Sequence, residues 1–474
     1  MSSTSALNSL LASTSPASGI DLSQILQAAT GASSAGIDVT SAVNAAVTAA
    51  QAPETAWEDQ EATLQSQGTA LTQIQADATN LDNDMQSLNS ITGPLSAMTV
   101  SSSNSSLVNA SAASGSTPGN NTIVVNSLAT TGSWASATVA SATTDLAAGS
   151  FTITDPAGNA TTISTGTGTS TLSDVANTIN ADGLGVTASV ITDATGARLA
   201  IVSSASGVAN DFTVAPVAGG LTFAHVVPAV NASLTVDGIN IVSASNTVTG
   251  ALPGVTLNLL NASPGTNVSL TVAPDTTQAA TAITQFVTDY NKAVSDLNTQ
   301  FTDAGTGEGV LATDSDVRSL QTTLEGALDY VSTPASGTTT TVSNLSDLGI
   351  SVNNDGTLTL DSGTLTNALQ NNFGDVQSFL QGTSMNGFAN SLDQALTSFI
   401  SPGDGAFTVD LSSMSTQYSG LQTDISNFET NYITPLKAQL QSEYSSAEIL
   451  LQQLPTEMQQ INTELGNNTN SSSS

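Results

Sequence analysis

The stretch LQSQGTALTQIQADATNLDNDMQSL (residues 64–88) decides the fold, because its apolar residues recur at the spacing of one helix face. The first interval is seven residues, and the later intervals are three or four, as in a heptad seam. Gln, Asp, Thr and Asn occupy the other faces, and Gly93-Pro94 ends the pattern. The apolar positions of this first seam are Leu64, Leu71, Ile74, Ala78, Leu81, Met85 and Leu88. The sequence therefore predicts a long amphipathic helix.

A second seam lies near the carboxy end, with apolar residues spaced alternately by three and four. Its positions are Leu411, Met414, Tyr418, Leu421, Ile425, Phe428 and Tyr432. After Pro435 the pattern resumes one position out of phase, through Ala447, Leu451, Leu454, Met458, Ile461 and Leu465. Because proline removes a helix hydrogen bond and clashes with the preceding turn, we expect a break or bend at 432–436 and a kink at Pro455. The two seams predict coiled-coil-like legs that pair with each other or with neighbouring subunits.

The middle of the chain has the two-residue alternation of β-strands. TIVVNSLA (122–129) reads as a half-buried strand, and hairpins are predicted at 150–164, 186–204 and 233–244. The last hairpin turns at Asp237-Gly238, a favoured pair for a two-residue turn. LSDVANTINADGLG (172–185) reads as a short helix, which indicates an α+β module inserted in a larger β domain.

Helical spacing returns after Pro274, over 276–301, 313–331 and 362–372, with a hairpin at 348–361. The expected fold class is α+β multidomain, with a helical leg formed by both termini and nested β-rich domains in the middle. The expected divisions are a disordered tail 1–18, N-terminal leg helices 19–98, a β-rich domain 99–138 and 227–275, an inserted α+β domain 139–226, a helical and hairpin domain 276–410, a C-terminal leg 411–465 and a disordered tail 466–474.

Charge limits the partners that this chain can bind. It has 38 acidic residues against four Lys and Arg, a formal net charge of −34. Nucleic acids and anionic membranes are bound through Lys and Arg, so both are excluded as partners. The balance is typical of a soluble, self-repelling protein, and adaptation to acid surroundings is a second hypothesis.

The chain has no cysteine, which excludes disulfides, thiol catalysis and iron–sulfur clusters. The sequence has no run of 18 apolar residues, so no membrane-spanning segment is predicted. Its amino terminus also lacks the basic and apolar regions of a secretory signal. If the protein leaves the cell, we expect another export route.

No constellation of side chains predicts catalysis, a metal or a cofactor. His225 is the sole histidine, and its apolar surroundings favour a packing role. SVNNDGTLTLDS (351–362) lacks the first and last ligands of a calcium loop and reads as a turn. GTGTS (166–170) lacks the lysine of a phosphate-binding loop. The pair Asp82 and Asp84 is expected on a solvent face, outside any pocket.

Several segments together resemble the flagellar filament cap family, also called hook-associated protein 2. They are the segment from GIDVTSAVNAAVTAAQ to Leu71 (36–71), TIVVNSLATTGSWAS (122–136), the module 172–207, the segment from SLTVDGINIVSA to Leu297 (233–297), and LSDLGISVNNDGTLTLD (345–361). Their order along the chain is the family's order. The unusually low Lys and Arg content and Pro455 depart from the family pattern.

The resemblance implies a non-enzymatic, ring-like homo-oligomer at the filament tip, under which exported flagellin folds and polymerises without being lost. It implies flagellar type III export without a cleaved signal, contact with flagellin and hook–filament junction proteins, and an export chaperone at the C-terminal helix. A hook-junction protein or a surface adhesin built from the same β-modules is the alternative, and a carbohydrate-active enzyme is a third hypothesis. For the cap, the residues of the two seams are the candidate leg-packing or subunit contacts.

Overall fold

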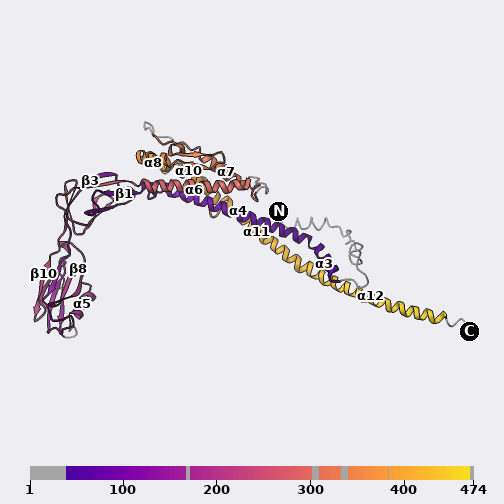
Figure 1. Ribbon diagram of the computed structural model, residues 1–474, viewed down its shortest axis with the longest axis horizontal. Helices are drawn as coiled ribbons and strands as arrows, with labels where there is room; N and C mark the ends of the chain where they lie inside the picture. The colour runs from indigo at the N-terminus through magenta and orange to yellow at the C-terminus, as the bar shows by residue number, and fades with distance from the viewer. Residues whose placement is uncertain (1–38, 167–170, 302–308, 333–339, 383, 470–474) are drawn as a thin grey trace. The chain divides into compact units, whose positions relative to one another are not determined.

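The computed structural model describes residues 39–166, 171–301, 309–332, 340–382 and 384–469 (Figure 1). Contacts divide the chain into two units. Unit 1 comprises the described parts of Met1–Thr79, Ser295–Gln321 and Leu396–Ser474, and unit 2 comprises those of Asn80–Val294 and Thr322–Ala395. The predicted tail 1–18 lies outside the described residues, as do residues 470–474 of the predicted tail 466–474, whereas residues 466–469 are helical.

Unit 1 is helical and is built from both ends of the chain, as the two seams predicted. Its elements are α3 (Val39–Ala50), α4 (Ala52–Asn89) as far as Thr79, the end of α6 (Thr276–Phe301), the first part of α7 (Ser315–Ala327), the end of α10 (Phe388–Ile400), α11 (Ala406–Phe428), the π-helical turn η4 (Glu429–Ile433) and α12 (Thr434–Thr469). Val43 and Val47 of α3 pack on Ile433, with Leu440 and Tyr444 of α12 around them. N-terminal and C-terminal helices therefore share one apolar cluster, and α3 lies beside α12 (Figure 1).

Of the break or bend expected at 432–436, the break does not occur, because a π-helical turn joins α11 to α12. In η4 the Thr434 N–H donates to the Glu429 carbonyl, five residues back, and α12 then continues through Pro455. Such a turn inserts one residue into the helix, which is the same one-position slip as the slip in the seam. It also places Pro435, which has no N–H, directly after a widened turn. Ile433 is 4% exposed whereas Tyr432 is 52% exposed, so the buried stripe moves by one residue.

The helical part of unit 2 surrounds the end of α4. Leu81, Met85 and Leu88 are fully buried there. Its other elements are most of α6, the end of α7, η3 (Leu345–Leu348), β16 (Ile350–Val352), β17 (Leu358–Leu360), α8 (Ser362–Asn371), α9 (Phe373–Gln381) and α10 (Phe388–Ile400) as far as Ala395. The rings of Phe286 in α6 and Phe388 in α10 meet edge to face at 5.7 Å. Asp275 begins α6 by accepting the N–H groups of residues 277 and 278.

Two antiparallel sheets of unit 2 share one core and form a β-sandwich. The five-stranded sheet has the order β1-β15-β3-β11-β12, and the three-stranded sheet has the order β13-β14-β2. The strands are β1 (Met98–Ser102), β2 (Val108–Ala112), β3 (Gly119–Ser127), β11 (Ala232–Val236), β12 (Ile239–Ser243), β13 (Thr247–Leu252), β14 (Val255–Leu259) and β15 (Val268–Pro274), after the short helix η1 (Pro94–Ser96). The hairpin predicted at 233–244 is confirmed: Asp237 and Gly238 have φ of 48° and 81°, as a two-residue turn of this type requires.

An α+β module is inserted between β3 and β11, two strands that pair directly with each other. Its sheets have the orders β10-β4-β8-β7 and β6-β5-β9. The elements are β4 (Ser133–Ser136), β5 (Gly149–Thr154), β6 (Ala160–Thr165), α5 (Leu172–Ala181), β7 (Val186–Asp193), β8 (Gly196–Ser203), η2 (Val208–Asn210), β9 (Thr213–Ala218) and β10 (Phe223–Val227). The module begins with β4, ahead of the expected boundary at residue 139. Phe151, Ile179 and Ile201 are fully buried in its separate core.

Replacing Phe151 with alanine tests whether the inserted module has its own core. Phe151 is 0% exposed and its ring lies 4.7 Å from that of Phe223. We expect a loss of about 3–5 kcal/mol from the unfolding free energy of the module. Fluorescence of Trp134, in a Trp57→Phe background, follows this transition. Val217→Ala is the control, because Val217 is 59% exposed, and it should change stability by less than about 0.5 kcal/mol. Equal losses in the two variants would contradict a core centred on Phe151.

Candidate assembly site

The residues of the first seam lie inside the chain's own core. In unit 1, Leu71 and Ile74 are 0% and 3% exposed, and only Leu64 is half-buried. In unit 2, Leu81, Met85 and Leu88 are also buried. The first seam thus packs within one chain along most of its length, and its open end is at Leu64.

Most side chains of the second seam are only partly covered by the rest of the chain. Half-buried residues follow one another along α11: Leu411, Met414, Tyr418, Leu421, Ile425 and Phe428. Tyr432 is exposed. Phe428 already has partners within the chain, since its ring lies 5.4 Å from Trp57 and 5.1 Å from Tyr432. The side chains of α11 before Phe428 are therefore the better candidates for contact with another chain.

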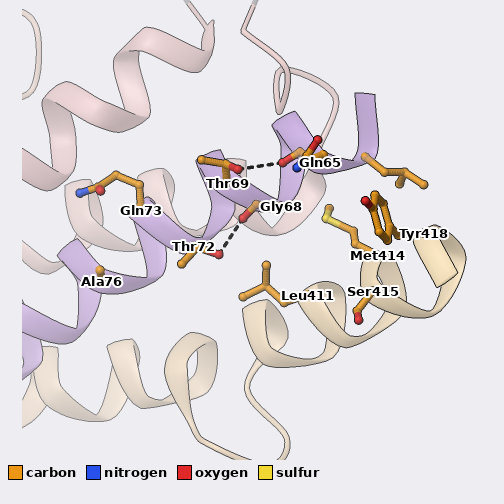
Figure 2. Close-up of a pocket in the computed structure, with 11 residues that line it drawn as sticks. Gln65, Gly68, Thr69, Thr72, Gln73, Ala76, Leu411, Met414, Ser415 and Tyr418 are labelled. Atoms are coloured by element: carbon orange, nitrogen blue, oxygen red, sulfur yellow. Dashed lines mark hydrogen bonds between the residues drawn. The ribbon is translucent and has the colours of Figure 1, made fainter. Parts of the chain in front are cut away.

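A groove of about 660 Å³ runs between α4 and α11 in unit 1. Gly68, Thr72 and Ala76 form part of its α4 side, and Leu411, Met414 and Tyr418 lie on its α11 side (Figure 2). The remaining lining residues are Leu64, Gln65, Thr69, Gln73 and Ser415. The two candidate seams thus meet at Leu64 and at the first three residues of the α11 stripe.

No charged side chain lines the groove, and the hydroxyl groups of its two threonines are already hydrogen-bonded within α4. The Thr69 and Thr72 hydroxyls donate to the carbonyls of Gln65 and Gly68, at 2.9 and 2.7 Å (Figure 2). Threonines that bond back in this way keep their polar atoms on their own helix. No side chain fills the space above Gly68, where an added Cβ would meet nothing within 4 Å. A groove of this kind suits the apolar face of a helix.

Polar contacts join α4 to α11 on either side of the groove. Gln75 Nε2 donates to Thr408 Oγ1 at 3.1 Å, and Gln422 Nε2 donates to Glu61 Oε1 at 3.0 Å. The same Gln422 amide reaches the Tyr418 hydroxyl at 3.0 Å. A hydrogen bond to Glu61 raises the pKa of the Tyr418 phenol, so the ring stays neutral at physiological pH. These contacts hold the walls of the groove together without using a cation.

The other residues considered for chemistry take structural roles. His225 stacks on Trp134 with ring centroids 4.5 Å apart, and its Nε2 lies 3.7 Å from Asp211 Oδ1. Asp355 accepts the N–H and hydroxyl of Thr357 in the β16–β17 turn, as the turn interpretation of that segment predicted. The glycine-rich GTGTS lies almost wholly outside the described residues. Within the described ranges no three acidic, His or Cys side chains group as metal ligands, and no helix is long and apolar enough to cross a membrane.

The expectation that Asp82 and Asp84 lie on a solvent face is wrong. Asp82 is 6% exposed, and its Oδ2 accepts Gln86 Nε2 at 2.8 Å. Asp84 is half-buried, and its Oδ2 is enclosed. Both residues flank the seam positions Leu81 and Met85, where neighbouring helices cover them. Positions beside an apolar stripe are covered when two helices pack on the same helix.

Helices from both chain ends and one β module nested in another define an α+β multidomain protein. The N-terminal and C-terminal profiles of the flagellar hook-associated protein 2 family match residues 35–132 and 229–456, most of the chain. The chain belongs to this family. The inserted module falls between these two matches, and the flagellin hook IN motif matches 150–205 within it.

The chain is similar to curated members of that family and to a solved structure. It is 30% identical over 244 residues to the B-type flagellar hook-associated protein 2 of Pseudomonas aeruginosa, covering 45% of this chain and 50% of that protein. It is 33% identical over 167 residues to flagellar hook-associated protein 2 of Salmonella typhimurium, 33% of this chain and 34% of that one. The matches thus span half or less of these relatives. The crystal structure of the D1-D2-D3 domains of the Escherichia coli flagellar cap protein FliD superposes with a TM-score of 0.60 at 27% identity, covering 73% of this chain and 99% of that one.

Replacing Gly68 with leucine tests the groove without harming the fold. Since an added Cβ meets no atom within 4 Å, we expect unchanged or higher helix stability, by up to about 1 kcal/mol. A leucine there fills the space between α4 and α11, so we expect loss of self-association by light scattering. Gly420→Leu is the matched control, because Gly420 lies on α11 outside the groove and is also unobstructed. A Gly68→Leu protein that assembles as well as Gly420→Leu would show that the groove is not a subunit contact.

Proposed function

We propose that this protein is a flagellar filament capping protein. It forms an oligomeric cap at the filament tip, promotes the folding and polymerisation of exported flagellin, and prevents the loss of flagellin from the tip. The observation that carries the proposal is the structural likeness to the Escherichia coli flagellar cap protein FliD, which extends over 73% of this chain. The role is structural, and no catalytic step is assigned to any residue.

The α4–α11 groove supports the self-association that a cap needs. Its lining is apolar and uncharged, and its free space lies beside Gly68. A chain with a net charge of −34 repels its own copies in solution. An uncharged contact surface lets copies meet where this repulsion is weakest. We therefore assign the subunit contact to Leu64 and to α11 from Leu411 to Ile425, with buried Leu71, Ile74, Leu81, Met85 and Leu88 holding α4 in place.

The exposed end of α12 supports a second partner, an export chaperone. Apolar side chains of α12 are more than half exposed there, at Ile449, Leu450, Met458 and Ile461. Exposed apolar residues on a helix end are typical of a surface that another chain covers. Export through the flagellar type III apparatus and contact with the hook–filament junction complete the proposal, and both rest on the family resemblance.

Deleting the gene tests the proposed function directly. We expect the deletion strain to release flagellin monomers into the medium and to lack filaments under the electron microscope, because no cap retains the subunits. A plasmid copy of the wild-type gene and of Gly420→Leu should restore filaments, and Gly68→Leu should not. Normal filaments in the deletion strain would overturn the cap proposal and favour an adhesin. Missing hooks or junctions, with polymerisable flagellin, would favour a junction protein.

A further inference from the structure

Two pairs of aspartates join α4 to its neighbours inside unit 2. Asp82 lies against Asp393 of α10, and Asp84 lies against Asp289 of α6. Residues two apart on a helix point in different directions, so the two pairs face two different helices. The end of α4 is therefore held between α6 and α10 by contacts in which both partners are acids.

One oxygen of each α4 aspartate lacks a donor if all four groups are ionised, whereas Asp82 Oδ2 accepts from Gln86 and Asp289 Oδ2 accepts from Gln285. Asp82 Oδ1 and Asp84 Oδ2 are enclosed, and neither accepts a hydrogen bond from a protein N–H or O–H. Asp82 as a whole is 6% exposed. The partners Asp393 and Asp289 are half-buried. Two neighbouring carboxylates repel each other, and an enclosed oxygen without a donor is destabilising. A proton on one member of each pair supplies the missing O–H donor and removes the repulsion.

In each pair the acidic partner shifts the pKa of the α4 aspartate in the same direction as burial does. Burial, followed by the hydrogen bond and charge of Asp393, raises the pKa of Asp82 from 3.8 to about 6. Burial, followed by the charge of Asp289, raises the pKa of Asp84 to about 7. Gln86 opposes the shift at Asp82 only in part. On α6, Tyr290 follows Asp289 and is itself buried and neutral, its pKa raised by burial and by Glu325.

A third acidic contact repeats the pattern in unit 1. Asp410 of α11 lies near Asp314 and Asp316 at the start of α7, and burial followed by these two charges raises its pKa. Asp314 is also the N-cap of α7, accepting the N–H groups of residues 316 and 317. Carboxyl groups thus meet between helices in both units of a chain that has only four Lys and Arg.

We propose that the Asp82–Asp393 and Asp84–Asp289 pairs each bind one proton, and that these shared protons fasten α4 to α10 and α6. In this protein the proton takes the place that a lysine or arginine has in an ordinary interhelical ion pair. The helical part of unit 2 is therefore strengthened by mild acid and loosened by alkali, independently of what the assembled protein does.

The sign of the pH dependence follows from the direction of the shifts. A carboxyl group whose pKa is higher in the folded state binds more protons there than in the unfolded chain. Its contribution is complete below pH 3.8 and is lost as the pH rises through 6 to 7. Turn aspartates such as Asp355 have a lowered pKa, so their contribution is lost only on the acid side, as the pH falls below 3.8. Stability should therefore be greatest in mild acid.

Thermal unfolding of the full chain at pH 5 and pH 8, at one ionic strength, tests the proposal. We expect the wild type to unfold at a higher temperature at pH 5. The double variant Asp82→Asn, Asp84→Asn should lose most of this difference, because an amide stays neutral and still offers a donor. Asp59→Asn is the matched control, since Asp59 is an exposed aspartate on the same helix. It should keep the wild-type difference, although it also removes one negative charge.

Three results would overturn the proposal. The first is a double variant with the full wild-type difference, and the second is an equal loss in Asp59→Asn. The third is magnesium or calcium raising the unfolding temperature at pH 8 as much as acid does, which would make the pairs cation sites. If the double variant does not fold, infrared spectra of the wild type show whether the folded protein holds protonated carboxyl groups. At pH 6, where ordinary aspartates are ionised, the folded protein should show the carbonyl band of protonated carboxyl groups, and its absence refutes shared protons.

Discussion

The burial of the apolar stripe of α4 is the interaction on which the helical parts of both units depend. Leu71 and Ile74 belong to unit 1, and Leu81, Met85 and Leu88 belong to unit 2. Each fully buried Leu or Met contributes about 1.5–3 kcal/mol relative to exposure, so this single stripe is a major part of the helical core. Unit 1 draws its other helices from the end of the chain, which means that its core forms only after segments far apart in sequence have met.

The nested β modules are compatible with a helical core built from distant segments. Each insertion leaves from one strand and returns at the neighbouring strand. The inserted α+β module departs after β3 and returns at β11, and these strands pair through Val125–Leu234 and Ile123–Val236. The sandwich in turn connects to helices through β1 and β15, which also pair with each other. Chain ends that lie close together allow a module to be inserted without disturbing its host. The separate cores around Leu234 and Phe151 fit this arrangement.

Periodicity and turn residues predicted the helices and hairpins whose signals are local. The segments 276–301 and 233–244 formed as expected, the first from helical spacing and the second from Asp237-Gly238. The edge strands β9 and β10 and the helices α9 and α10 escaped prediction, because short segments packed by distant partners carry little periodic signal. The phase slip at Tyr432 was visible in sequence. The cause of this slip was not visible in the sequence, because a helix break and a π-helical turn shift the apolar stripe by the same amount.

The groove and the aspartate pairs differ in how far the sequence could reveal them. The seam spacing identified Leu64, Leu411, Met414 and Tyr418, but the empty space at Gly68 exists only once α4 and α11 are packed. Asp82 was misplaced because a carboxylate beside a helix seam is normally solvated. Its burial depends on α10, a helix that the sequence did not predict.

The side-chain amides of Gln and Asn form many of the contacts between elements that ion pairs form in other helical proteins. Gln381 is 6% exposed and donates to the carbonyls of Leu88 and Ser90, at 2.9 and 3.1 Å, at the end of α4 where helix carbonyls lack partners. Asn291 bonds both the N–H and the carbonyl of Leu358, and Gln75 reaches Thr408. These neutral bonds respond neither to pH nor strongly to salt. In a chain whose helices are joined in this way, the few buried carboxyl groups are the part of the helical core that can respond to acidity.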